Sequence, residues 1–333
     1  MNRIAILSNA GSGRNRKRTE LLRLLDATSG VDQQVTADSD EIEGALGRLL
    51  DREPAVLAVN GGDGTLQAVL TAWHRGVRCG ALPESAPPIA VLPAGSTNMS
   101  AHDLGCGGRL KRRVGDLLAL RDRPPSAWRI EARAPLAVVD AEAQVRLGFF
   151  FGMGTIVRGI EYWHETLRHG GGAGEWGAGA ALLRAAWGMA RKEPPFDQPA
   201  RVRIGTRPGR SAVPAQRADV SFLLATTMRR LFLGISPFWG SDTGPLALTW
   251  VEDGARRLVP RVPALLRGQG DRLPAREGYH ATRSDEIELA FDDPWAIDGE
   301  VFAATPRLRL SEGPRLCFLR LADDLGPAAG AVP

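Results

Sequence analysis

The first 124 residues alternate between short apolar runs and helical patterns, and this alternation restricts the fold more than any other feature of the sequence. Strands connected through helices are joined by right-handed crossovers into a parallel sheet that is covered on both faces. We therefore expect an α/β domain. Strands are predicted at residues 3–8, 33–36 and 55–60 and directly before the loop at 92–98, and helices at 18–27, 39–51 and 65–74, the last capped by Thr65.

The pattern changes at Pro124–Pro125. Beyond it most segments alternate in polarity, are rich in β-branched residues and are broken by prolines, which is typical of an antiparallel sheet or sandwich. A helical stretch at about 156–192 interrupts them and carries Trp176 and Trp187, which suit an interfacial lid or, more simply, an ordinary core. A chain of 333 residues exceeds a comfortable single core. We expect domains at 1–124 and 125–333, with a C-terminal tail that could return to the first.

Charge and composition exclude several classes of protein. No apolar run reaches the length of a membrane span, and the first residues read as a strand and a glycine loop rather than a signal peptide, which predicts a cytoplasmic protein. Three scattered cysteines argue against disulfides or a zinc site. The net charge of +4 suits an anionic ligand or membrane surface, or is only a solvated basic surface. Nucleic acid is not an expected partner, because basic clusters and stacking aromatics are not interleaved.

Three glycine-rich loops follow predicted strands, at residues 8–18, 60–65 and 92–98. In a parallel sheet such loops meet at the carboxyl edge, where ligands bind, and each offers backbone N–H groups to an anion. The first loop also carries Arg14, Arg16, Lys17 and Arg18 at a helix start, where cations are disfavoured unless a polyphosphate binds or the turn is frayed. It is not a dinucleotide fingerprint, since Arg16 stands at the third glycine position. The three loops together predict a phosphate site.

Asp63 lies inside the second glycine loop, where a carboxylate should repel phosphate. A divalent cation between the two would remove the repulsion, and Mg²⁺ typically takes one or two carboxylates together with phosphate oxygens. The alternative, a carboxylate that caps its own helix, leaves the surrounding glycines unexplained. The loop therefore predicts a site for a magnesium–nucleotide complex.

The motifs NGGDGTLQAV, LPAGSTNMSAHDLG and AIDGEVF, in this order, resemble the diacylglycerol kinase catalytic domain family, which includes bacterial lipid kinases and sphingosine kinases and is distantly similar to NAD kinases. The resemblance implies an N-terminal α/β domain of the phosphofructokinase type, a C-terminal β-sandwich, and ATP with Mg²⁺ as cofactors. It implies these nucleotide-binding residues: Asn9, Gly11, Ser12, Gly13, Arg14, Thr36, Gly61, Gly62, Asp63, Gly64, Thr65, Gly95, Ser96 and Asn98.

The AIDGE segment matches the family's catalytic Asp-Gly-Glu motif, so the resemblance implies catalytic roles for Asp298 and Glu300, with Asp63 as the third candidate. In an extended segment, residues two apart point the same way, so these two carboxylates should share a face. A solvated turn between two strands is the competing interpretation. Met99 departs from the family pattern in the loop that contacts the acceptor lipid. Asp242 departs from it at the family's second metal site, where it is the candidate metal ligand.

The sequence thus predicts an ATP-dependent lipid kinase that phosphorylates a hydroxyl of diacylglycerol or a similar membrane lipid. The alternatives are a kinase for a soluble acceptor and a non-catalytic regulator that binds lipid or nucleotide. The expected partners are the acceptor lipid, an anionic membrane surface at the inner face of the membrane, and a second copy of the chain in a homodimer.

Overall fold

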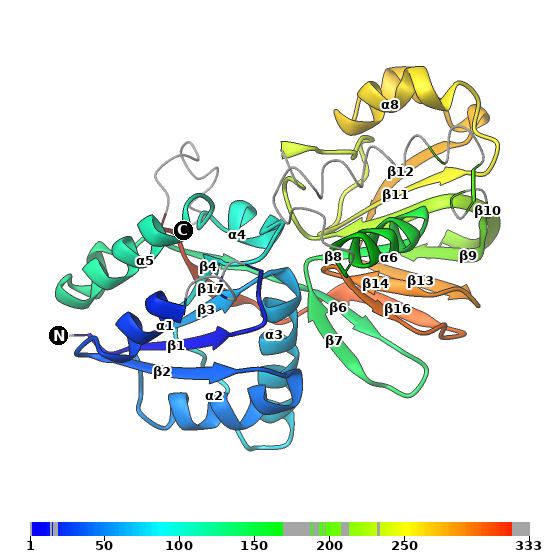
Figure 1. Cartoon of the computed structure of the whole chain (residues 1–333). Coiled ribbons are helices and arrows are strands. Elements are labelled where there is room, and N and C mark those ends of the chain that lie inside the picture. Colours follow the sequence, from blue (N-terminus) through cyan, green and yellow to red (C-terminus); the bar gives the residue numbers. More distant parts are fainter. Residues whose placement is uncertain are drawn as a thin grey trace. The chain divides into compact units, whose positions relative to one another are not determined.

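The computed structural model divides into two compact units, which we describe separately (Figure 1). The first contains residues 1–133 and 315–333, and the second contains residues 134–314. The first unit therefore extends past the boundary expected at residue 124. The structure describes residues 2–13, 15, 19–168, 188, 193–194, 196, 198–207, 213–231 and 234–321.

The first unit is an α/β domain, as its alternating sequence predicts. Its strands are β1 (Ile4–Asn9), β2 (Val31–Thr36), β3 (Val56–Gly61), β4 (Ile89–Pro93), β5 (Ile130–Arg133) and β17 (Leu316–Leu319). Its α-helices are α1 (Thr19–Asp26), α2 (Ile42–Leu50), α3 (Asp63–Arg78), α4 (Met99–Asp103) and α5 (Leu110–Ala119).

These strands form one sheet in the order β2-β1-β3-β4-β17-β5, and all its pairs are parallel except β17 with β5. Strands β1, β3 and β4 are almost wholly buried, which is why they appear in the sequence as continuous apolar runs. Strand β17 comes from the end of the chain and lies between β4 and β5. The C-terminal segment thus completes the sheet of the first unit.

The second unit is strand-rich. Its strands are β6 (Leu136–Val139), β7 (Val145–Gly148), β8 (Phe150–Gly154), β9 (Ala200–Arg207), β10 (Val213–Thr226), β11 (Leu246–Glu252), β12 (Tyr279–Ser284), β13 (Glu286–Phe291), β14 (Trp295–Ile297), β15 (Glu300–Phe302) and β16 (Leu308–Glu312). Its described α-helices are α6 (Thr155–Arg168) and α8 (Leu258–Leu266).

All pairs between these strands are antiparallel, and hydrogen bonds link the strands into one sheet of eleven. One buried cluster contains side chains of β6, near one end of the sheet, and of β14, near the other. The sheet must therefore curve so that its inner face closes around a shared core. An α/β domain followed by an antiparallel β-rich domain, the predicted fold class, is confirmed.

Two sequence-based expectations concern helices of this unit. The helix expected at 156–192 begins at Thr155, and its described part ends at Arg168. Trp176 and Trp187 lie outside the described residues, so their expected roles stay predictions. Within the described part of the chain, each helix is too short or too polar to cross a bilayer.

Candidate active site

The loops after β1, β3 and β4 lie at one edge of the first sheet, because the three strands are neighbours and run in the same direction. The chain moves from β1 outward to β2, then returns past β1 to β3 and continues to β4. The order therefore reverses between β1 and β3, and ligands of open α/β sheets bind at such a reversal, outside the carboxyl ends of the strands. The predicted meeting of the three loops is confirmed.

Asn9, at the end of β1, connects the first loop to the second. Its Nδ2 donates to Thr65 Oγ1 of α3 over 3.0 Å, and its Oδ1 accepts the N–H of Gly11 over 2.8 Å. Ser12 Oγ lies 3.5 Å from the same threonine oxygen. Thr65 is not the helix cap that its sequence position suggests, because α3 begins two residues earlier, with Gly62 as its N-cap. Its hydroxyl instead connects two loops across the strand-order reversal.

Beneath these loops lies a polar network that sequence analysis missed. Asn15 is buried, and its Nδ2 donates to the carbonyls of Asn9 and Asn60 over 2.8 and 3.0 Å. Asn60 Nδ2 in turn donates to Ser8 Oγ over 3.1 Å. The sequence did contain a signal for this network: Ser8 and Asn60 are polar residues near the ends of neighbouring buried strands, where apolar residues are normal. The Oδ1 atoms of both Asn15 and Asn60 are buried without a described hydrogen-bond partner.

Two of the glycines are required by contacts within the protein. A Cβ at Gly61 would lie 2.4 Å from the side chain of Thr65. A Cβ at Gly95 would lie 2.5 Å from the Cα of Gly62, so the loops after β3 and β4 contact each other backbone to backbone. Close packing of the two loops therefore explains these residues before any ligand is considered. Gly13 differs, since no described atom lies within 4 Å of a Cβ built there.

Asp63 caps a helix, but not its own. Its Oδ2 accepts the N–H of Met99 over 3.0 Å, and its Oδ1 accepts the N–H of Ser100 over 2.7 Å. These are the first two N–H groups of α4, which have no partner within the helix. Asn98, the backbone N-cap of α4, has φ 52°, and its side chain bonds to Gly95 N and O over 2.7 and 2.8 Å. Asp63 and Asn98 together fix the loop after β4 against the start of α3.

Two opposing effects act on the pKa of Asp63. Burial raises its pKa above the ordinary value of 3.8, while the N–H bonds from Ser100 and Met99 act to lower it. Burial is the larger effect. Asp63 is half-buried, and a cation near it would stabilise its charged form.

The other nucleotide-binding candidates lie at the same edge. Thr36 is buried at the end of β2 and pairs with Asn9, and its carbonyl accepts the N–H of Ala10 over 3.0 Å. Gly64 is in the first turn of α3, and Ser96 is half-buried in the loop after β4. Arg14 lies outside the described residues.

Asp298 belongs to a tight hairpin turn rather than to an extended segment. β14 and β15 are joined by Asp298 and Gly299, with φ 49° and 90°, and positive φ at both positions is what a type I′ turn requires. The Asp298 carboxylate is buried and accepts the N–H of Phe149 over 2.9 Å and that of Phe150 over 2.8 Å. Its own N–H donates to the carbonyl of Phe150 over 2.8 Å. The side chain thus fastens the turn to the junction of β7 and β8.

Glu300 has a different environment. Its side chain is exposed at the start of β15 and makes no hydrogen bond or ion pair with another described residue. The expectation that Asp298 and Glu300 share a face is therefore wrong. That expectation assumed extended backbone at both positions, whereas Asp298 has left-handed backbone and turns its carboxylate inward.

The described residues do not show a metal centre built by the protein alone. No group of three or more His, Cys, Asp or Glu side chains among them is arranged to hold a metal ion. Asp242 is exposed and accepts a hydrogen bond from Thr282 Oγ1 over 2.7 Å.

Comparison with known proteins gives a family match for part of the first unit. Residues 3–125 match the family model described as the diacylglycerol kinase catalytic domain. The matched residues lie wholly within the first unit. A search of curated proteins gave no match.

The whole chain resembles solved structures in fold. One structure of a candidate diacylglycerol kinase from Bacillus anthracis str. Sterne has 14% identity and a TM-score of 0.58, with 96% of each chain covered. A second, described as a diacylglycerol kinase from the same organism, has 12% identity, a TM-score of 0.57 and the same coverage. At this identity the likeness concerns the fold, and it extends beyond the catalytic domain into the antiparallel unit.

The loop edge of the first unit offers backbone groups that suit an anion. The first N–H groups of α3 have no partner within that helix, and its dipole favours an anion at this end. The N–H groups of Gly11 and Ser12, in contrast, already bond to Asn9. Gly13 and the start of α3 therefore offer the backbone N–H groups that remain available to an anion.

Proposed function

We propose that the protein is a lipid kinase that transfers the γ-phosphoryl group of Mg·ATP to a hydroxyl of diacylglycerol or a similar membrane lipid. The observation that carries this proposal is the loop edge at the strand-order reversal of a diacylglycerol kinase catalytic domain. The proposal places the reaction at the inner face of the membrane, where a cytoplasmic enzyme meets its lipid acceptor, and a second copy of the chain remains a proposed partner.

In this function the catalytic domain holds the nucleotide. Gly13 and the start of α3 would bind phosphate oxygens through backbone N–H groups, and Thr36, Ser96 and Asn98 would shape the surrounding edge. When Mg²⁺ is bound, it neutralises charge on the phosphates. Asp63 is the one carboxylate in the three loop sequences, and its ionised form would be favoured beside that cation.

The antiparallel unit would supply the proton acceptor for the lipid hydroxyl. In phosphoryl transfer, positioning and charge neutralisation do most of the work, and a carboxylate receives the hydroxyl proton. Glu300 is exposed and can be reached by a substrate, while Asp298 holds the turn on which Glu300 is mounted. We propose these two residues as the acceptor pair, with different roles.

The deciding experiment uses the purified full chain, ATP labelled in the γ-phosphate and mixed micelles that contain diacylglycerol. We expect label in the organic phase after extraction, only when Mg²⁺ is present. Label in a water-soluble product alone would favour the soluble-acceptor alternative. Nucleotide binding without any transfer would favour the non-catalytic alternative, for which the inward-turned Asp298 carboxylate is the supporting observation.

A further inference from the structure

The segment from Gly254 to Gly278 concentrates positive charge. It contains six arginines and two acidic residues, a net charge of +4 that equals the formal net charge of all 333 residues. The segment runs through α8 and the turns on either side of it, within the second unit. Residues 14–18 and 109–113 carry the same net charge, so the pocket and the apolar surface described next are what distinguish this segment.

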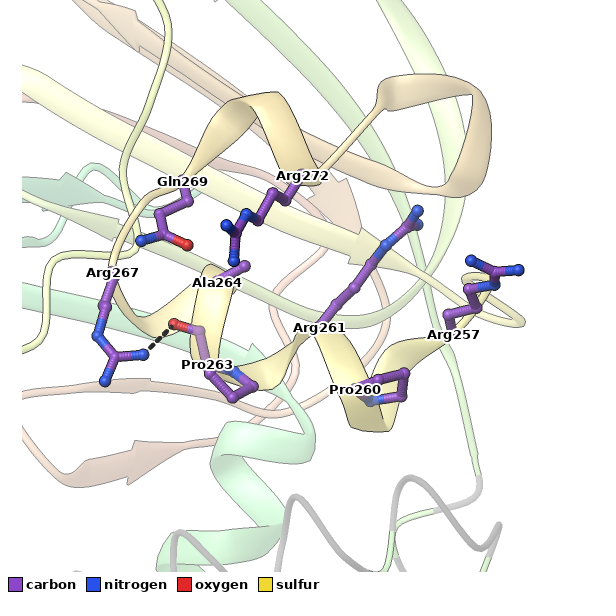
Figure 2. Close-up of a pocket in the computed structure, with 8 residues that line it drawn as sticks. All are labelled: Arg257, Pro260, Arg261, Pro263, Ala264, Arg267, Gln269 and Arg272. Atoms are coloured by element: carbon purple, nitrogen blue, oxygen red, sulfur yellow. Dashed lines mark hydrogen bonds between the residues drawn. The ribbon is translucent and has the colours of Figure 1, made fainter.

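Four of these arginines, Arg257, Arg261, Arg267 and Arg272, line a pocket of about 650 Å³ (Figure 2). Arg261 is committed to the protein, because it pairs with Glu277 over 2.6 Å and lies 5.3 Å from the ring centre of Tyr279. The other three are exposed and form no ion pair with another described residue. Their charges are therefore available to an anion from outside.

The same helix exposes apolar surface beside the charges. Val259 is 55% exposed, and Pro260 and Pro263 are exposed on the helix between Arg257 and Arg267. The arginines alone would be enough to bind a free phosphate ion, which has no need of the exposed apolar side chains. Cationic groups interleaved with exposed apolar side chains on a helix are typical of binding at the interface of an anionic membrane.

We infer that α8 and its flanking turns are a membrane-docking surface, whose arginine pocket takes the phosphate of an anionic phospholipid while Val259 enters the acyl boundary. Guanidinium groups bind phosphate through paired N–H donors, so a pocket with three available arginines can hold a headgroup phosphate. This inference concerns binding only and does not depend on phosphoryl transfer.

The sequence also predicts membrane contact at two other basic clusters, residues 14–18 and 109–113, and in the second of these Arg109, Lys111 and Arg112 are exposed. Within Arg109–Arg113, the last arginine is buried and donates to Gly107 O and Asp116 over 2.7 Å each, as well as to the carbonyl of Leu321. Its guanidinium stabilises the catalytic domain and cannot face a bilayer. The other expected cluster, at residues 14–18, lies mostly outside the described residues.

The test measures binding of the full chain to phosphatidylcholine vesicles with and without phosphatidylglycerol, by sedimentation and without ATP. The variant is R257Q/R267Q/R272Q, and the matched control is R201Q/R203Q/R217Q, which removes the same charge from exposed positions on β9 and β10. Each arginine near an anionic surface contributes about 1 kcal/mol, so the first variant should bind about a hundredfold more weakly. The control should change by less than about threefold. A third variant, V259S, should weaken binding roughly fivefold, with a loss that salt does not alter.

Several results would overturn the inference. Equal losses in the two triple variants would mean that only net charge matters. Unchanged binding of R257Q/R267Q/R272Q would place the membrane contact elsewhere. Complete release from the vesicles by millimolar inorganic phosphate would identify a small-anion site instead. Since the exposed substitutions should leave the fold intact, circular dichroism and thermal unfolding of all variants accompany the binding data.

Discussion

Asp298 shows how one residue can have a structural role that its motif does not reveal. In the sequence it is half of a two-carboxylate motif, and extended backbone would turn both carboxylates to one side. In the structure it has φ 49°, and its carboxylate accepts the N–H groups at the start of β8, so the hairpin turn is fastened from within. Asp-Gly is also the dipeptide that type I′ turns favour. The structure therefore gives Asp298 a structural role, beside the catalytic role that we propose for it.

The two carboxylates should accordingly differ in their effect on stability. Asp298→Asn puts an NH₂ donor where the carboxylate accepts backbone N–H groups, and leaving a buried donor unpaired costs about 1–3 kcal/mol. Glu300→Gln changes an exposed side chain and should stay within about 0.5 kcal/mol of the wild type. Chemical denaturation of both variants measures the difference. Equal stability would show that the Asp298 hydrogen bonds contribute little, and a lower kcat in that variant could then be assigned to catalysis directly.

At the scale of elements, contacts between their residues join the loops after β1, β3 and β4 into one assembly. Asn9 connects the first loop to α3, Gly62 contacts Gly95, and Asp63 caps α4. Each connection uses a residue of the glycine motifs. The motif residues are thus needed to assemble the edge as well as to bind a ligand, and loss of activity alone cannot separate these roles.

The variant Asp63→Asn separates the structural role from the ligand-binding role through the pH dependence of the free energy of unfolding. Because burial raises the pKa of Asp63, the folded wild type binds this proton more readily than the unfolded chain. Its free energy of unfolding should therefore fall as the pH rises from 3.8 through the raised pKa, and Asn lacks this loss. The difference in unfolding free energy, variant minus wild type, should be more positive at neutral pH than below pH 3.8.

The same variant should lose the Mg²⁺-dependent part of its nucleotide affinity, as calorimetry with and without the metal can measure. Asp51→Asn, at an exposed aspartate after α2, is the control. If the variant is instead relatively less stable at neutral pH, the bonds from Met99 and Ser100 dominate, and Asp63 is chiefly a helix cap. Unchanged nucleotide affinity would remove it from the ligand site.

At the scale of the molecule, the chain leaves the catalytic domain after β5, builds the antiparallel unit, and returns as β17. That strand pairs with β4 and β5, so the parallel sheet is completed by residues 316–319. Phe318 is buried, and Cys106 and Arg113 also bond to carbonyls of the returning segment. The fold of the catalytic domain therefore depends on the far end of the chain.

Phe318→Ala should destabilise the catalytic domain by about 3–5 kcal/mol, the usual cost of deleting a buried ring. Cys317→Ser changes an exposed side chain of the same strand and should have little effect. Hydrogen exchange can locate the change: protection should fall in β3 and β4 and persist in β9 and β13. A loss confined to the antiparallel unit would contradict the placement of β17.

The sequence by itself determined the features that depend on neighbours along the chain. Alternating apolar runs predicted the parallel sheet, and the change of pattern after Pro125 predicted an antiparallel unit, because periodicity reflects which faces of each element are buried. The meeting of three glycine loops followed from strand direction alone. It did so without knowledge of any side-chain contact.

Only the tertiary structure decided which distant groups meet. The cap of α4 by Asp63, the bond between Asn9 and Thr65 and the anchoring of Asp298 join residues 36 to 149 positions apart, and no local pattern encodes such pairs. The sequence left open whether the C-terminal tail returns to the first unit, and a four-residue strand does not reveal that its place is between β4 and β5. Local preference selects helix, strand or turn, but the partner of a buried polar group is set by the packing that removes it from water.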